Sequence, residues 1–155
     1  MRAYYDITTR IKDWLEANDI INTVTLGDIS EVDLNKQTIF PLAHQIVNVA
    51  TLSERLITFD LSILFIDVVD YPTKSDKDSA EAFYRSSNLQ DVHNTMLAVA
   101  NELAQQFFRG TLFDENYIVD TEVTCEPFQD RFENDLAGWS LTLSIQVPNN
   151  TTGVC

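Results

Sequence analysis

The clearest strand pattern in the chain is LITFDLSILFIDVV, which occupies residues 56–69. From Ile57 to Ile63 the odd-numbered positions are apolar, while Thr58, Asp60 and Ser62 between them are polar. Since successive side chains of a strand point to opposite faces, one face is apolar and the other polar. From Leu64 onward both faces are apolar. We therefore expect a strand over Leu56–Val69 whose distal half is covered on both sides.

Further strand patterns lie on either side of this segment. The last of them alternates cleanly over nine residues, which predicts a sheet with one face under helices and one polar face. Pro41 has no N–H to donate, so we expect it at a sheet edge or strand entry. Residues between Asn48 and Glu54 are interpreted as a turn. The predicted strands are Ile20–Leu26, Ile39–Val49, Tyr117–Cys125 and Trp139–Val147.

Two segments have helical periodicity. Residues 3–17 carry apolar side chains at spacings of three and four, and so do residues Leu89–Phe108. Ser87 followed by Gln90 fits a capping box at the start of the second helix. The sequence therefore predicts one α+β domain over residues 1–155, in the order α-β-β-β-α-β-β. An antiparallel or mixed sheet of about five strands would be packed on one face by an N-terminal helix and a long central helix.

Two segments are expected to lie outside this framework. Residues 71–85 form a long charged stretch, and a loop of this length in a compact domain is commonly functional. Residues 148–155 form a polar C-terminal tail. The candidate subunit-contact residues in the long loop are Pro72, Lys74, Asp76, Lys77 and Asp78.

The charge of the chain excludes one class of partner. It has 24 acidic and 10 basic residues, a formal net charge of -14. Such a surface does not hold a polyanion by counterion release, so we expect no specific nucleic-acid binding. Asp60, Asp120 and Glu122 are assigned to the polar faces of strands and form a candidate acidic face. No stretch has the length of a membrane span or the pattern of a signal peptide, so a protein made in a cytoplasm is expected.

The residues that carry catalytic chemistry have no recognisable spacing. The only histidines, His44 and His93, each fall beside apolar residues of predicted elements, and we interpret both as structural or surface residues. Cys125 and Cys155 are expected to be free thiols. His44, Asp67, Asp70 and His93 match no known metal-ligand spacing, and the run Asp28, Glu31, Asp33, Asn35 lacks the glycine and final glutamate of a calcium loop. No metal, cofactor or enzymatic activity is therefore expected.

Phe128, Arg131 and Phe132 leave two interpretations open. They form either an exposed partner-binding patch or a loop that anchors on its own core. The core interpretation is favoured because Phe128 and Phe132 are separated by polar and charged residues.

The element order, the acidic composition and two segments resemble a family of phage proteins. The segments are FPLAHQIVN at Phe40–Asn48 and LITFDLSIL at Leu56–Leu64. The element order in an acidic chain resembles the lambda-type tail-terminator proteins of long-tailed bacteriophages, and the two segments resemble small neck and tail proteins of phages more generally. The resemblance implies a ring of identical subunits, commonly a hexamer, that caps the tail tube and joins it to the head. It also implies assembly in the host cytoplasm, a place in the virion, and other tail-tube or neck proteins as partners.

Two other classes of function remain alternatives. A small adaptor or immunity-type protein would use the acidic surface to bind a basic protein partner. An enzyme with carboxylate chemistry is the third alternative, and it is the least favoured because no paired carboxylates stand out. In a ring, acids that face the lumen would repel DNA and keep it from adhering as it passes.

Overall fold

A mixed α+β fold with one sheet and two long helices confirms the predicted element order. The computed structural model describes residues 3–32, 37–69, 89–110, 117–119, 122–129 and 136–149. In this described part, no helix is long and apolar enough to cross a membrane. The helices are α1 (Ala3–Ala17), α3 (Leu89–Arg109) and the short 3-10 helices η1 (Ile29–Glu31) and η2 (Gln37–Ile39). The strands are β1 (Thr23–Leu26), β2 (Leu42–Leu52), β3 (Leu56–Val68), β4 (Ile118–Val119), β5 (Thr124–Gln129) and β6 (Leu136–Pro148).

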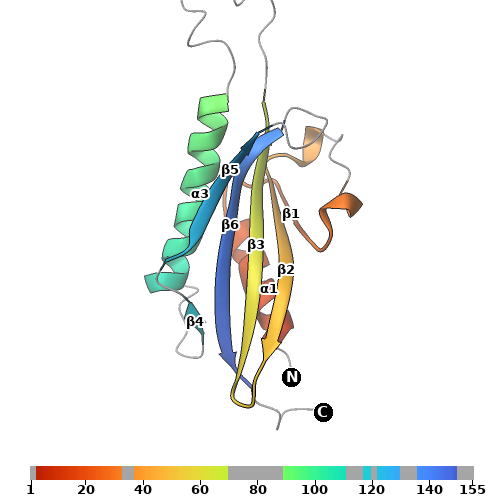
Figure 1. Cartoon of the computed structure of the whole chain (residues 1–155). Helices are drawn as coiled ribbons and strands as arrows, with labels where there is room; N and C mark the ends of the chain where they lie inside the picture. Colours follow the sequence, from red (N-terminus) through yellow and green to blue (C-terminus); the bar gives the residue numbers. More distant parts are fainter. Residues whose placement is uncertain are drawn as a thin grey trace, which may run out of the picture.

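The sheet is built around β3, the strand with the clearest sequence pattern. The strand order is β1-β2-β3-β6-β4, and β5 pairs with β6 on the same side as β4. β1 is parallel to β2 and the other pairs are antiparallel, so the sheet is mixed. β3 and β6 pair along their whole length, from Leu56 opposite Pro148 to Val68 opposite Leu136. Figure 1 shows α1 behind β2 and β3, with α3 alongside β5.

The main core lies between the sheet and the helices. The apolar face of β3 meets Ile11 and Leu15 of α1 and the stripe of α3 that includes Met96 and Leu103. These four helix residues are fully buried, and burial of a large aliphatic side chain contributes about 1.5–3 kcal/mol. The alternation seen in the sequence therefore sets which face of β3 receives the helices.

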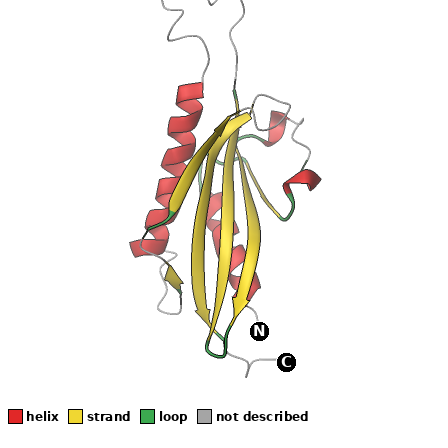
Figure 2. Cartoon of the chain, viewed as in Figure 1, coloured by secondary structure: helices red, strands yellow, loops and turns green. Residues whose placement is uncertain are grey.

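A second apolar cluster covers one end of the opposite face. Leu42, Leu64 and Ile66 pack there with Phe40 and Leu136. The segment that connects β1 and β2 supplies Ile29, Val32 and Ile39 to the same cluster. This confirms that the distal half of β3 is covered on both sides. Among the described residues, no helix packs on the other half of this face (Figure 2).

The prediction of a turn from Asn48 to Glu54 is wrong for residues 48–52, which belong to a strand. β2 continues to Leu52, and only Ser53, Glu54 and Arg55 connect it to β3. The register shifts between Val47 and Val49, so Asn48 forms an irregularity inside the strand. Its side-chain amide donates to Ser62 Oγ at 2.7 Å. An asparagine between β-branched residues is thus accommodated by a bulge, and the strand continues.

Three other predicted strands have different limits. β1 begins at Thr23 rather than Ile20, and Ile39 belongs to η2 rather than to β2. The segment predicted as Tyr117–Cys125 forms two strands, because β4 ends at Val119 and β5 begins at Thr124. Both pair with β6, which begins three residues before the predicted Trp139. The capping residue Ser87 lies outside the described residues.

Candidate functional site

The surface feature that stands out is the edge of the sheet at β2. β1 pairs only with Leu42–Gln45 and ends at Leu26. Beyond that point, in the described part of the chain, no strand pairs with the outer side of β2 over residues 46–52. Residues 48–52 are all exposed, and none from 46 to 52 is charged. An edge strand presents unpaired N–H and C=O groups, and an uncharged one is a template for another strand.

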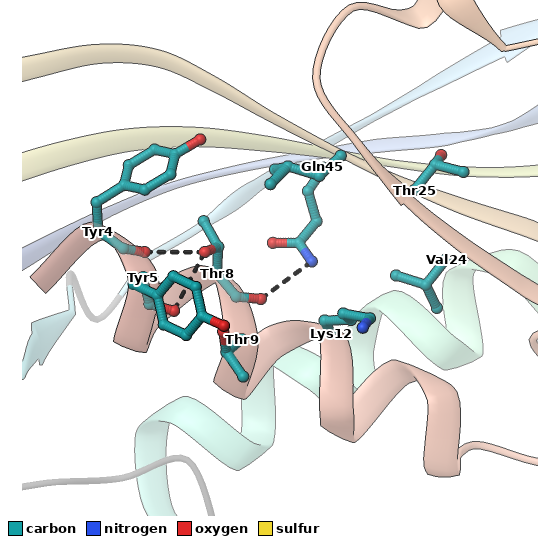
Figure 3. Close-up of a pocket in the computed structure, with 9 residues that line it drawn as sticks. Tyr4, Tyr5, Thr8, Thr9, Lys12, Val24, Thr25 and Gln45 are labelled. Carbon is teal, nitrogen blue, oxygen red and sulfur yellow. Dashed lines mark hydrogen bonds between the residues drawn. The ribbon is translucent and has the colours of Figure 1, made fainter. Parts of the chain in front are cut away.

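A groove lies where β1 ends. It has a volume of about 300 Å³ and runs between α1 and the β1–β2 edge. Figure 3 shows Gln45 reaching from β2 toward α1, with Tyr4 and Tyr5 on one side and Val24 on the other. The lining residues are Tyr4, Tyr5, Thr8, Thr9, Lys12, Val24, Thr25, Leu26 and Gln45.

The polar group of the groove is the side chain of Gln45. It is 2% exposed, and its Nε2 donates to the carbonyl oxygen of Thr8 at 3.4 Å. Its Oε1 is buried without a hydrogen-bond partner among the described residues. An unsatisfied buried acceptor costs about 1–3 kcal/mol, so a donor that entered the groove would recover this energy.

The rim of the groove is apolar. Tyr4, Tyr5 and Leu26 expose 48%, 65% and 46% of their surfaces. Tyr4 also packs edge-on against Phe59 with ring centroids 6.2 Å apart, which holds its ring next to the sheet. Tyrosine-rich, partly apolar surfaces are typical of protein–protein contacts. The single base in the lining, Lys12, forms an exposed ion pair with Glu16 at 3.6 Å.

His44 is a structural residue that ties the end of β1 to β2. It is fully buried; its Nε2 lies 2.8 Å from the carbonyl oxygen of Gly27 and its Nδ1 2.6 Å from Thr25 Oγ1. Because a carbonyl only accepts, Nε2 carries the proton and Nδ1 accepts from the threonine. Burial lowers the pKa of His44, although the Gly27 carbonyl and Asp28 act in the opposite direction. The neutral form is thus favoured.

His93 has a comparable role between α3 and the other side of the sheet. Its Nε2 lies 3.2 Å from the carbonyl oxygen of Phe128 in β5, while Trp139 Nε1 donates to the carbonyl oxygen of His93 at 2.8 Å. The two rings also meet edge-on at 5.9 Å. The two histidines thus hold separate elements and do not form a common site.

The candidate acidic face is present only in part. Asp60 lies on the face of β3 opposite α1 and α3, where it accepts a hydrogen bond from Ser144 Oγ in β6. Glu122 is exposed, but it lies between β4 and β5 and not on a strand face. Asp120 lies outside the described residues. The placement of Asp60 agrees with the alternation in the sequence, whereas the break between β4 and β5 removes Glu122 from the pattern.

The remaining candidates are either buried or outside the described residues. Phe128 is 9% exposed in the second apolar cluster, as the core interpretation expects. Burial raises the pKa of Cys125 to about 11, so its thiol is a weak nucleophile at neutral pH. Outside the described residues lie Arg131, Phe132, Asp70, Cys155 and the whole contact loop with Pro72, Lys74, Asp76, Lys77 and Asp78.

The faint calcium-loop pattern has a structural explanation where it is described. Asp28 caps η1 by accepting from the N–H of Ser30 at 2.9 Å, which lowers the pKa of the Asp28 carboxyl. Asp33 and Asn35 lie outside the described residues. Within the described ranges, no group of three or more His, Cys, Asp or Glu side chains is placed to hold a metal ion.

Sequence reasoning missed the groove and the open edge. One signal is present, since residues 46–52 are β-prone and uncharged in an otherwise acidic chain. Because asparagine is common in turns, Asn48 favoured the interpretation of the residues that follow it as a turn. The short length of β1, which exposes the edge, has no clear signal in Ile20–Leu26.

No protein-family model matches this chain, and neither does the sequence of any curated protein.

Proposed function

We propose that this protein is a non-enzymatic structural subunit of a tailed bacteriophage, one that assembles into a ring at the tail or neck. The observation that carries the proposal is the uncharged edge of β2, unpaired among the described residues, beside a groove with an apolar rim. A subunit with such an edge has a surface that is completed by pairing with another chain. The element order of the resembling tail-terminator family is consistent with this role.

The acidic composition supports the same proposal. A net charge of -14 disfavours adhesion of DNA, which a ring around a DNA channel has to let pass. On the face of the sheet opposite α1 and α3, Asp60 is held in place by the hydrogen bond from Ser144. The role assigned to a ring subunit is therefore to close and connect the tail rather than to grip nucleic acid.

The first test is the mass of the assembled protein. Light scattering and native mass spectrometry should give a discrete multiple of the subunit mass, and negative-stain images should show a ring with a central channel. A single-subunit mass at high concentration, both alone and with purified tail tubes, would contradict the proposal.

The alternative function is that of a small acidic adaptor or immunity-type protein with a basic partner. The net charge favours it, because an acidic surface steers a basic protein toward it. A monomer that captures a basic protein in a salt-sensitive complex would support this alternative.

A further inference from the structure

We propose that the open edge of β2 and the groove beside it receive the C-terminal segment, residues 150–155, of a neighbouring copy of this chain. The inference rests on the ring proposed above and names the contact that would close it. The donated segment would add a strand to the sheet of the next subunit, which is a known mode of peptide recognition.

The groove has the position of a missing strand. β1 occupies the outer side of β2 only as far as Gln45, and the groove begins at its last residue, Leu26. A strand added beside residues 46–52 would continue the line of β1 and send alternate side chains into the space in front of α1. There Tyr4 and Tyr5 would cover them, and an N–H or hydroxyl of the added segment would reach the unsatisfied Oε1 of Gln45.

The last described residue brings the C-terminal segment to the correct end of the sheet. Asn149 follows β6 and is fixed to the β2–β3 turn, because its N–H donates to the carbonyl oxygen of Arg55 at 2.8 Å. Its Nδ2 donates to the carbonyl oxygen of Ser53, also at 2.8 Å. Ser53 directly follows the open edge. Asn149, from which the segment continues, therefore lies at the turn that ends the β2 edge.

The direction of the strands favours a neighbouring copy over the same chain. β2 and β6 are both antiparallel to β3, so both run toward the turn at Ser53. To lie on its own β2 edge, the segment would have to reverse, which takes at least about two residues. A neighbouring copy can receive the segment without this reversal. Six residues in extended conformation would span about 20 Å, a length that suits a contact with a neighbouring subunit.

The charges of the two surfaces are also compatible. Neither the edge, residues 46–52, nor the segment 150–155 carries a charged side chain, in a chain with 34 charged residues. Two copies with a net charge of -14 repel each other, and this repulsion is smallest where the contacting surfaces carry no charged side chains. The segment Asn-Thr-Thr-Gly-Val-Cys also contains β-branched residues, which suit a strand.

The first experiment compares the assembly of three variants with that of the full chain, by native mass spectrometry at equal concentration. We expect two of them to lose at least about tenfold of the assembled fraction. These are a chain that ends at Asn149 and the variant Ala50→Glu, which places a charge on the exposed edge. Thr142→Glu is the matched control, since Thr142 is exposed in β6 and adds the same charge away from the edge. Circular dichroism checks that each variant is folded.

The second experiment traps the contact covalently. In a Cys125→Ala background, Val49→Cys places a thiol on the edge, and Cys155 supplies the natural thiol of the segment. Mild oxidation should give disulfide-linked multimers on a non-reducing gel. Ile118→Cys is the control, because Ile118 is 56% exposed on the far side of the sheet, and it should give no such multimers.

The outcomes separate this inference from the proposed function. Rings that persist without residues 150–155 would overturn the strand donation and leave the ring in place. If the thiol introduced by Val49→Cys joins Cys155 of its own chain, or forms no disulfide at all, the strand donation is also overturned. A full chain that remains a single subunit under all conditions would overturn both proposals.

Discussion

At the scale of single residues, Gly138 is a position at which the sheet leaves no room for a side chain. It lies in β6 opposite Ile66, and a Cβ built there would overlap the carbonyl oxygen of Phe65 and come within 3.2 Å of Ile66 Cα. Since backbone atoms cannot move aside as a flexible side chain can, Gly138→Ala must push β6 away from β3. We expect a loss of about 1–3 kcal/mol in the free energy of unfolding, measured by urea denaturation. Thr142→Ala in the same strand should change it by less than about 0.5 kcal/mol.

His44 makes the stability of the fold depend on pH. Its pKa in the folded chain lies below the ordinary value of 6.5, so the unfolded chain binds the proton more readily. The stabilisation by neutral His44 is therefore complete above pH 6.5 and is lost as the pH falls from there toward the folded pKa. Urea denaturation between about pH 7.5 and 5.5 should show this decline in the full chain. In His44→Gln the decline should be smaller, and an unchanged slope would contradict the assignment.

At the scale of elements, the contact of α3 with β5 depends on His93 and Trp139. β5 is a short strand that pairs only with β6 in the described part of the sheet, and His93 links it to the helix through the Phe128 carbonyl. We expect His93→Ala to raise hydrogen exchange of the β5 amides several-fold while β3, between two long strands, stays protected. Asn94→Ala is the control, because Asn94 is exposed on the same helix. Equal exchange in both variants would show that β5 does not need this link.

The sequence predicts elements well where one side-chain period continues unbroken. β3 and β6 alternate over many residues, and α1 and α3 keep a buried stripe, so their order and facing follow directly from the pattern. β2 is longer than predicted because Asn48 resembles a turn residue, although a bulge absorbs it. The groove could not be predicted, since it depends on where β1 ends relative to α1, which is a tertiary relation. The interpretation of the histidines as structural is sound, but their partners at Gly27 and Phe128 are backbone carbonyls that leave no sequence signal.

At the scale of the whole molecule, the net charge gives opposite predictions for the two proposed functions. Copies with a net charge of -14 repel one another, and salt reduces the range of this repulsion from about 30 Å at 0.01 M to about 10 Å at 0.1 M. A ring held together by the neutral β2 edge and segment should therefore assemble more completely as salt is added. A complex of an acidic adaptor with a basic partner is held by attraction between opposite charges, so salt should weaken it.

Light scattering between about 0.01 M and 0.3 M sodium chloride shows whether assembly rises or falls with salt, because the Debye length falls steeply over this range. We expect the assembled fraction of the full chain to rise several-fold, and the midpoint concentration for assembly to fall. The chain that ends at Asn149 should remain at the subunit mass throughout, since screening removes repulsion but does not replace the lost strand. Assembly that weakens with salt would mean that charged groups hold the subunits together, which the uncharged edge cannot explain. The contact would then have to be sought among the acidic and basic side chains instead.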